Sequence, residues 1–366
     1  MINANFWRGR RVLLTGHTGF KGAWLALWLN RMAAEVVTVA LAPEHERDLY
    51  NLVRPELVAE VIGDIRDVAV VERAVALHQP EIVLHLAAQS LVRRSYKAPC
   101  DTYATNVMGT AHVLDAVRRC PSVKAALVIT TDKVYENLET GRAFVESDAL
   151  GGHDPYSASK ACTDILTASF RRSFFEQGGT TVATARAGNV IGGGDWSEDR
   201  IVPDIVRAIE AGEAVRLRYP SAVRPWQHVL EPLAGYLLMA EAMASASWHT
   251  DALNFAPDPD NEKTVARLVE TFTAAFGGRP GWAQEPVAQP QEAQLLTLSA
   301  DKAKAVLGWR PLLDFDDTVR WTADWYRAFL DKGDMRGVTL GQIARYEERL
   351  AQGASAQRSK GREQLQ

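Results

Sequence analysis

The stretch RVLLTGHTGFKG at residues 11–22 decides the fold that the rest of the chain must complete. Residues 11–15 form a short apolar run typical of a buried strand, and the apolar spacing of residues 23–32 predicts a helix. Between them, Gly16, Gly19 and Gly22 recur at intervals of three. We interpret this strand, glycine-rich turn and helix as the first unit of an alternating α/β chain.

Further apolar runs bounded by turn residues repeat this pattern. They lie at residues 36–40, 82–86, 126–129 and 181–185, with helical patterns between most of them. Alternating strands and helices predict a parallel sheet with helices on both faces, because right-handed crossovers must lie over the sheet. We therefore expect a doubly wound α/β fold.

The pattern changes after about Gly192, where glycine and proline interrupt the chain and helices are expected at residues 203–211, 232–246 and 264–276. A chain of 366 residues suits a large α/β domain with a smaller second region. The last stretch, residues 353–366, is polar and lacks aromatic residues, as in a frayed tail. We predict three parts. Residues 1–191 form a cofactor-binding domain that carries the catalytic residues, and residues 192–330 form a mixed, mainly substrate-binding region, from which some of the chain can return to the first domain. Residues 331–366 form a C-terminal helix and a disordered tail.

Composition excludes several classes of partner. A hydrophobic fraction of 47% and a charged fraction of 23% are typical of globular proteins, and the formal net charge of -4 provides no attraction to nucleic acid or anionic membranes. No apolar run approaches the roughly 20 residues of a transmembrane helix, and the N-terminus lacks an export signal. The three cysteines show no Cys-x-x-Cys spacing, so we expect no metal site. These features indicate a cytoplasmic protein that acts on small molecules.

The glycine-rich turn favours a dinucleotide cofactor. Glycines let the backbone approach a pyrophosphate, whose charge then lies at the free N–H groups and positive dipole of the helix N-terminus. The spacing differs from G-x-G-x-x-G, and an ordinary β–α turn is the alternative. The predicted cofactor contacts in this turn are Gly16, Thr18, Gly19, Phe20 and Gly22.

Two later strand ends extend the same hypothesis. Asp64 can accept a hydrogen bond from the adenine amino group while Ile65 packs against the ring, although Asp64 could equally cap a helix. The small residues around Leu86, Ala87 and Ala88 would let a nicotinamide ribose lie against the backbone; close packing is the alternative. The second strand ends without a clear acid for the ribose hydroxyls, Glu44 being only a late candidate, so the choice between NAD and NADP stays open.

Tyr156 and Lys160 are the first candidate catalytic residues. They are four residues apart, hence on one face of a helix that begins after Asp154-Pro155. A lysine cation and an oxidised nicotinamide would lower the tyrosine pKa from near 10 and make a base for a sugar hydroxyl. Such pairs also arise by chance on exposed helices, but the position of this helix after the fourth strand favours a catalytic role.

The loop that begins at Thr130 supplies a second group of candidates. It follows the strand at residues 126–129, at the carboxyl edge where open α/β sheets hold ligands. Thr131 offers an orienting hydroxyl, Asp132 a proton donor if it is kept neutral, and Lys133 a base if its pKa is depressed. The alternative is a capped turn with a surface aspartate and lysine. Thr130 is a predicted cofactor contact.

Together with the NVMGT stretch at 106–110, these motifs resemble the extended short-chain dehydrogenase/reductase family across about residues 10–326. The resemblance implies a Rossmann fold and NAD, with Tyr156 and Lys160 contacting the cofactor. Within that family, the pair Thr131-Asp132 looks like the nucleotide-sugar 4,6-dehydratases. Most of these follow the pair with glutamate, whereas TDKVYEN at 131–137 looks like the group that acts on CDP-glucose by internal hydride transfer.

Two more stretches, RAGNVIGGGDW at 186–196 and VRPWQHVL at 223–230, look like sugar-nucleotide-binding segments of the same family. Asn189 can hydrogen-bond a phosphate or a sugar, and the forked donors of Arg224 suit a diphosphate; a glycine-rich loop and a surface ion pair are the alternatives. The substrate contacts implied by the resemblance are Gln89, Ser90, Thr131, Asn189, Arg224 and His228.

The resemblance also implies a homodimer that pairs through residues 107–118 and 157–175. Two other functions remain open at this stage. One is a dehydratase or 4-epimerase for a dTDP-, UDP- or GDP-linked sugar, and the other is a non-catalytic NAD-sensing regulator.

Overall fold

The computed structural model describes residues 1–176, 178–245, 248–278, 281–285 and 296–363. A seven-stranded sheet forms the centre of the molecule, with strand order β11-β6-β5-β4-β1-β2-β3. All neighbouring strands pair in parallel. The strands are β1 (Arg11–Thr15), β2 (Glu35–Ala40), β3 (Ala59–Ile62), β4 (Ile82–His85), β5 (Ala125–Ile129), β6 (Thr181–Arg186) and β11 (Ala252–Asn254).

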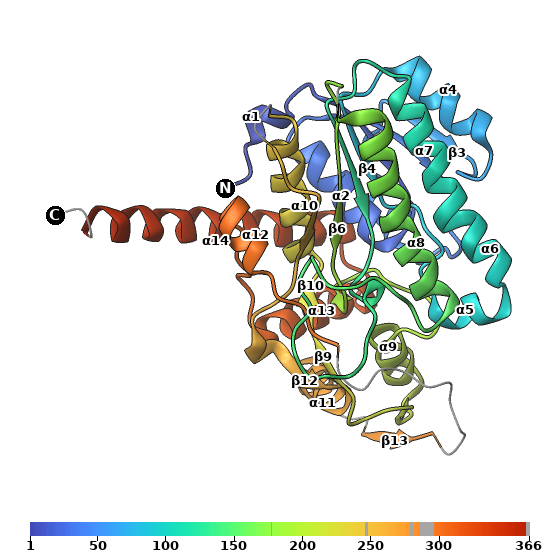
Figure 1. Cartoon of the computed structure of the whole chain (residues 1–366). Coiled ribbons are helices and arrows are strands. Elements are labelled where there is room, and N and C mark those ends of the chain that lie inside the picture. Colours follow the sequence, from blue (N-terminus) through green and yellow to red (C-terminus); the bar gives the residue numbers. More distant parts are fainter. Residues whose placement is uncertain (177, 246–247, 279–280, 286–295, 364–366) are drawn as a thin grey trace.

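Helices cover both faces of this sheet, which confirms the predicted doubly wound fold (Figure 1). The hydrophobic core consists of two clusters, one on each face of the sheet, because alternate residues of a strand point to opposite faces. On β1, Leu13 packs in one cluster, and Val12 and Leu14 pack in the other. The first cluster includes side chains from α4 (Val68–His78) and α7 (Gly109–Arg118). The second includes side chains from α2 (Phe20–Arg31) and α10 (Leu230–Met243). The period of two along each strand therefore buries both faces.

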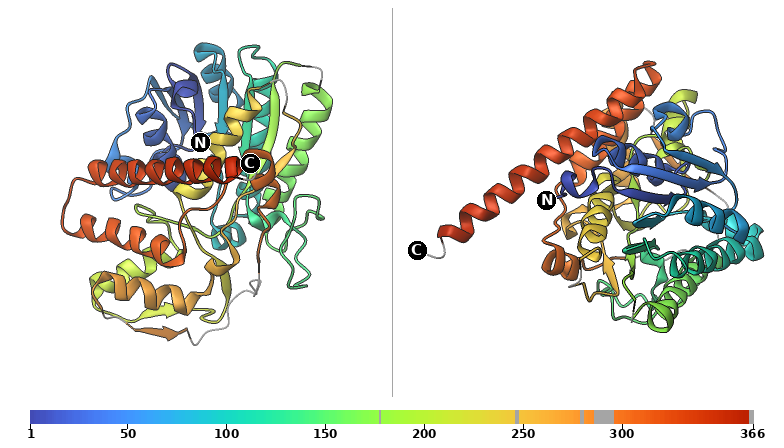
Figure 2. Two further views of the ribbon diagram at one scale, coloured as in Figure 1. Left: turned by 90° about the vertical axis from the view of Figure 1, so that its left-hand side faces the viewer. Right: turned by 90° about the horizontal axis from the view of Figure 1, so that it is seen from above.

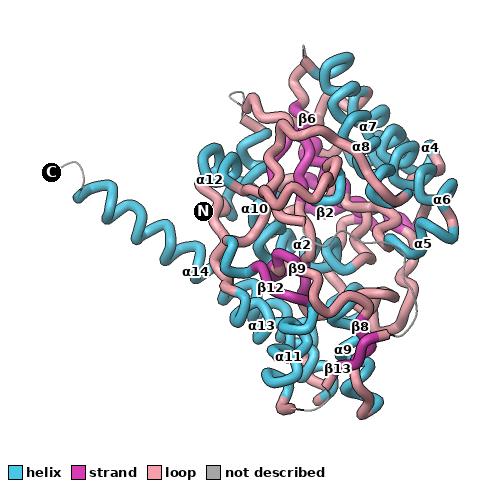
Figure 3. The backbone as a smooth tube through the Cα atoms, turned by 60° about the horizontal axis from the view of Figure 1, so that its bottom comes forward, coloured by secondary structure: helices cyan, strands magenta, loops and turns pink. Residues whose placement is uncertain are grey.

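The second region contains short strands and helices below the carboxyl end of the sheet (Figure 3). Three two-stranded sheets join β10 (Gln227–His228) to β7 (Val190–Ile191), β12 (Glu262–Thr264) to β9 (Val223–Pro225), and β13 (Trp282–Gln284) to β8 (Val215–Leu217). Its main helices are α9 (Ile201–Ala211), α11 (Val265–Phe276) and α13 (Phe315–Leu330). By contrast, α10 packs on the central sheet and β11 joins its edge, so residues 230–254 return to the first region.

The remaining helical elements are short or terminal. They are α1 (Ala4–Trp7), α3 (Leu49–Val53), α5 (Val92–Lys97), α6 (Pro99–Tyr103), η1 (Ala104–Met108), η2 (Asp132–Val134), α8 (Pro155–Phe170), η3 (Arg171–Phe175), η4 (Pro259–Asn261), α12 (Asp301–Leu307) and α14 (Met335–Glu363). Within the residues the structure describes, no helix is long and apolar enough to cross a membrane.

The C-terminal helix α14 begins against the body of the protein and then extends away from it (Figure 2). It remains helical to Glu363, whereas the sequence predicted a frayed tail from Gly353 onward. The difference has a physical reason: alanine, glutamine, arginine, lysine and glutamate all have high helix propensities. Residues 364–366 of the predicted tail lie outside the described part of the chain.

Candidate active site

A cavity of about 960 Å³ lies at the carboxyl ends of the strands. Turns and loops that follow β1, β2, β3, β4, β5 and β6 all contribute to it, and the second region closes its other side. This is the edge at which open α/β sheets hold ligands. The lining includes every predicted catalytic and cofactor residue and, of the predicted substrate contacts, Gln89, Ser90, Thr131, Asn189 and Arg224.

The glycine-rich turn is packed too closely for larger residues. Gly16 has a φ of +79°, and a Cβ atom there would lie 2.7 Å from the backbone nitrogen of Ala87. A Cβ atom on Gly22 would lie 2.0 Å from the carbonyl oxygen of Gly16. The turn thus holds the N-terminus of α2 directly against the end of β4. A pyrophosphate could approach the backbone here, as dinucleotide binding requires.

The two acidic candidates for the adenosine part of the cavity have protein partners. Asp64 accepts hydrogen bonds from the backbone nitrogen and Nε of Arg66, both at 2.8 Å, and this arginine lowers the pKa of the carboxyl group. Glu44 accepts two hydrogen bonds from Arg94, at 2.6 and 3.0 Å, which lower its pKa. Arg94 also contacts Glu198 at 3.1 Å, so it joins the end of β2 to the loop after β7.

Tyr156 and Lys160 lie on the same buried face of α8 and line the cavity. Asp154 caps this helix through the backbone nitrogen of Ser157 at 3.0 Å. Lys160 Nζ donates to the carbonyl oxygen of Ile129 at 2.8 Å, and burial lowers its pKa to about 8. Burial raises the pKa of Tyr156 to about 12, against the opposing effect of a hydrogen bond with Thr131. Ionisation of Tyr156 therefore needs a further positive charge in the cavity.

Asp132 lies at the centre of the neighbouring loop. Its Oδ1 accepts a hydrogen bond from Thr131 Oγ1 at 2.8 Å and forms an ion pair with Lys133 Nζ at 3.3 Å. Its Oδ2 accepts from Asn189 Nδ2 at 3.1 Å. A Cβ atom on residue 188, which is glycine, would lie 1.9 Å from Oδ2. Segments that follow β5 and β6 thus build one polar cluster beside Tyr156.

The predicted substrate contacts have different surroundings. Gln89 lines the cavity, but its amide is bonded to the protein, accepting from Leu91 N at 2.6 Å and donating to Thr102 Oγ1 at 2.9 Å. Ser90 Oγ accepts from Arg200 at 3.2 Å. Arg224 lies on β9 and lines the cavity.

His228 does not line the cavity, which corrects the sequence prediction. It is fully buried on β10, with the rings of Trp24 and Trp321 at 6.0 and 5.8 Å, and its Nδ1 accepts from Leu230 N at 3.3 Å. Burial lowers its pKa to about 3, so it is a neutral core residue. Neighbouring strand residues point to opposite faces, and the motif did not indicate which face would be the core.

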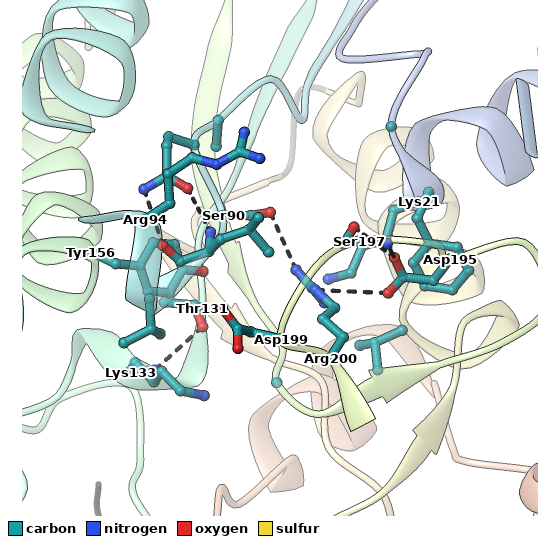
Figure 4. A pocket seen from close by; sticks show the side chains of 18 of the residues that line it. Lys21, Ser90, Arg94, Thr131, Lys133, Tyr156, Asp195, Ser197, Asp199 and Arg200 are labelled. Atoms are coloured by element: carbon teal, nitrogen blue, oxygen red, sulfur yellow. Dashed lines mark hydrogen bonds and ion pairs between the residues drawn. The ribbon is translucent and has the colours of Figure 1, made fainter. Parts of the chain in front are cut away.

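Several cavity residues were missed in the sequence. Figure 4 shows Arg200 between Tyr156 on one side and Lys21 on the other. Arg200 contacts Ser90 and, at 3.7 Å, Asp195. Burial, together with the nearby cations Arg200 and Lys160, lowers the pKa of Lys21 to about 7. The position of Lys21 inside the glycine motif could have indicated that it lines the cavity, whereas nothing in the sequence distinguished Arg200.

A doubly wound sheet, a glycine-rich turn and a buried tyrosine–lysine pair together define a short-chain dehydrogenase/reductase. Residues 13–322 match the family model described as GDP-mannose 4,6 dehydratase. The chain therefore belongs to this family of NAD-dependent nucleotide-sugar 4,6-dehydratases. Among the described residues, no group of three or more histidine, cysteine, aspartate or glutamate side chains is placed to hold a metal ion.

Individual relatives agree with this assignment. The CDP-glucose 4,6-dehydratase of Salmonella typhimurium is 43% identical over 94% of this chain and 98% of its own. The dTDP-glucose 4,6-dehydratase of Streptomyces antibioticus is 32% identical over 86% of this chain and 92% of its own. Among solved structures, the dTDP-glucose 4,6-dehydratase of Streptomyces venezuelae with NAD and TYD bound has a TM-score of 0.76 and 25% identity, covering 88% of this chain and 98% of that one.

Proposed function

We propose that this protein is a CDP-glucose 4,6-dehydratase that converts CDP-glucose to CDP-4-keto-6-deoxyglucose and water and uses bound NAD. The similarity to the Salmonella typhimurium enzyme over nearly the whole chain carries the proposal. The arrangement of Thr131, Asp132 and Lys133 beside Tyr156 supports it, because a dehydration needs an acid and a base in addition to the group that starts the oxidation.

The cofactor site fits NAD in its backbone geometry. Gly16 and Gly22 hold the turn in the close approach that a pyrophosphate needs, and Asp64 and Ile65, which line the same cavity, are the proposed contacts of the adenosine. When bound, NAD would supply an acceptor for the C4 hydride and return the same hydride to C6. Catalytic amounts of NAD should therefore suffice, and a stoichiometric demand would contradict the proposal.

Tyr156 takes the proton of the C4 hydroxyl group in this scheme. Its pKa near 12 in the resting cavity, where Lys160 is already present, means that the positive charge of the oxidised nicotinamide must lower it first. The resulting 4-keto group makes the hydrogen at C5 acidic.

Lys133 and Asp132 then carry out the elimination of water. Lys133 must be neutral to remove the C5 proton, and Asp132 must carry a proton to protonate the departing C6 hydroxyl group. Lys133 Nζ lies 3.3 Å from Asp132 Oδ1, so a proton can pass directly from one group to the other. Movement of one proton from the ammonium to the carboxylate converts the ion pair into a neutral base and a neutral acid.

The substrate is tested by mixing the protein and catalytic NAD separately with CDP-glucose, dTDP-glucose, UDP-glucose and GDP-mannose, and following the mass of each. Loss of one water from CDP-glucose alone is expected. Dehydration of another nucleotide sugar instead would reject the CDP assignment but keep the reaction. An unchanged mass with all four would favour a 4-epimerase or a non-catalytic NAD-binding protein.

The catalytic roles are tested with two variants in a single turnover. Lys133→Ala should still form enzyme-bound NADH on addition of CDP-glucose but should lose the dehydration. Tyr156→Phe should not form NADH. Unchanged turnover by the first variant, or NADH formation at the normal rate by the second, would refute the role of that residue.

A further inference from the structure

A buried polar cluster lies directly behind the catalytic residues. Its centre is Asp164, on α8, with a side-chain exposure of 3%, paired with Arg186, on β6, with 5%. Arg186 Nη2 donates to Asp164 Oδ1 at 2.9 Å. Thr184 Oγ1 donates to the same oxygen at 2.6 Å, and Thr130 Oγ1 donates to Oδ2 at 2.8 Å.

This cluster holds both ends of the catalytic loop. Thr130 immediately precedes Thr131 and is bonded to Asp164 directly. Tyr135 immediately follows η2, and its hydroxyl oxygen accepts a hydrogen bond from Arg186 Nη1 at 2.7 Å. The Tyr135 hydroxyl in turn donates to Asn254 on β11 at 2.7 Å. The segment that contains Asp132 and Lys133 is therefore tied to Asp164 directly at one end and through Arg186 at the other.

The same carboxylate belongs to the helix that carries the proposed base. Tyr156, Lys160 and Asp164 are spaced four residues apart on α8, so they lie on one helix face. We propose that Asp164 is a positioning residue, which holds the Tyr156–Lys160 helix and the Thr131–Lys133 loop in the relative placement that dehydration requires. This inference rests on the proposed function.

Asp164 also acts on Lys160 electrostatically. Burial lowers the pKa of Lys160 to about 8, and the negative charge of Asp164 opposes that effect. The charged and titratable groups around this pair come from several elements: Tyr156 on α8, His85 on β4, Lys21 on α2, Arg186 on β6 and Arg171 on η3. Loss of the carboxylate would leave mainly positive charge near Lys160, and its ammonium would then lose its proton at a lower pH.

The placement is tested first by a matched pair of variants that remove one hydroxyl each from the same carboxylate. Thr130→Val cuts the tie to the catalytic loop, whereas Thr184→Val cuts a tie to β6 only. At saturating NAD, we expect Thr130→Val to lower the dehydration rate with CDP-glucose by at least about tenfold, because small displacements of reacting groups are costly. Thr184→Val should stay within about twofold of the wild type. Equal losses in the two variants, or no loss in Thr130→Val, would overturn the inference.

The second test is the pH profile of Asp164→Asn in the first step, followed as enzyme-bound NADH. The alkaline limb of the profile should move to lower pH, since Lys160 has lost its countercharge. If Asp164 had a purely structural role, the variant would form less NADH in proportion to its folded fraction, and the alkaline limb of the pH profile would stay in place. That result would overturn the electrostatic effect of Asp164 on Lys160.

Asp164→Asn leaves Arg186 buried without its partner and can fail to fold; in that case the comparison of Thr130→Val with Thr184→Val decides alone. Wild-type protein is assayed in parallel. If the wild type dehydrates CDP-glucose and Thr130→Val is unimpaired, only the role of Asp164 fails. If the wild type dehydrates no nucleotide sugar, the proposed function fails and the inference falls with it.

Discussion

The side chain of Asp132 occupies a space that exists only because residue 188 is glycine. Each of its oxygens has a donor, Thr131 on one and Asn189 on the other. At this scale, placement is decided by distances of a few tenths of an ångström. A single added methyl group at residue 188 is therefore enough to test whether the position of the Asp132 carboxylate matters.

Gly188→Ala should therefore impair dehydration selectively. The added Cβ would lie 1.9 Å from Asp132 Oδ2, so the carboxylate must leave its present position between Asn189 and Lys133. We expect a fall in turnover of about a hundredfold, while NADH still forms in a single turnover with CDP-glucose. Gly341→Ala is the control, because a Cβ there meets nothing within 4 Å. Normal turnover by Gly188→Ala would show that Asp132 does not need this position.

Lys160 should make the free protein less stable near neutral pH. Its folded-state pKa of about 8 lies below the ordinary 10.5, so the unfolded chain binds more protons between these values and stability rises with pH through that window. Lys160→Met should be inactive but more stable at pH 7 by about 3 kcal/mol. Urea unfolding without NAD at pH 7 and pH 9.5 measures this. An equal difference between the two proteins at both pH values would contradict it.

At the scale of elements, β9 and β10 show how neighbouring strand ends acquire different roles. Arg224 on β9 lines the cavity, whereas His228 on β10 is enclosed between α2 and α13 by the rings of Trp24 and Trp321. The two residues are four positions apart in one motif, yet only one can reach a ligand.

We predict that a substitution of Arg224 on β9 affects substrate binding, whereas a substitution of His228 on β10 affects only stability. Arg224→Ala should raise the KM for CDP-glucose at least about tenfold, as expected for loss of a charge-assisted hydrogen bond. His228→Leu keeps an uncharged side chain in the core and should leave KM within about twofold, with any change appearing in the melting temperature. Steady-state kinetics and thermal unfolding of both variants decide it. A large KM effect in His228→Leu would restore the role that the sequence suggested.

At the scale of the whole molecule, exposed apolar side chains lie on η1, α8 and η3, and both η1 and η3 contact α8. Met108 on η1, Ile165 on α8 and Phe174 on η3 are 53%, 55% and 53% exposed. Exposed large apolar side chains on elements that contact one another are candidates for a protein–protein contact. The surface formed by these three side chains lies within residues 107–118 and 157–175, through which the sequence resemblance implied a homodimer.

We therefore expect a dimer in solution that Ile165→Glu converts to a monomer. Leu77→Glu is the matched control: Leu77 is 71% exposed on α4, and its charge should leave the dimer intact. Light scattering coupled to size-exclusion chromatography measures both masses. A monomeric wild type, or a dimer that survives Ile165→Glu, would reject this surface as the interface.

The doubly wound fold could be predicted from the sequence alone, and all of the predicted site residues except His228 line the cavity. These predictions rest on local patterns in the sequence. The patterns are apolar runs with a period of two or 3.6 residues, the spacing of Gly16, Gly19 and Gly22, and the four-residue spacing of Tyr156 and Lys160. Parallel strands bring their carboxyl ends to one edge, so motifs at strand ends had to meet there.

Only the tertiary structure decided which side chains are free to meet a ligand. It assigned the amide of Gln89 to Leu91 and Thr102, placed His228 in the core, and joined Asp164 to Arg186 across 22 residues of sequence. The physical reason is that a hydrogen-bond partner or a buried face depends on which elements pack together. Residue spacing along one strand or helix carries no information about that packing.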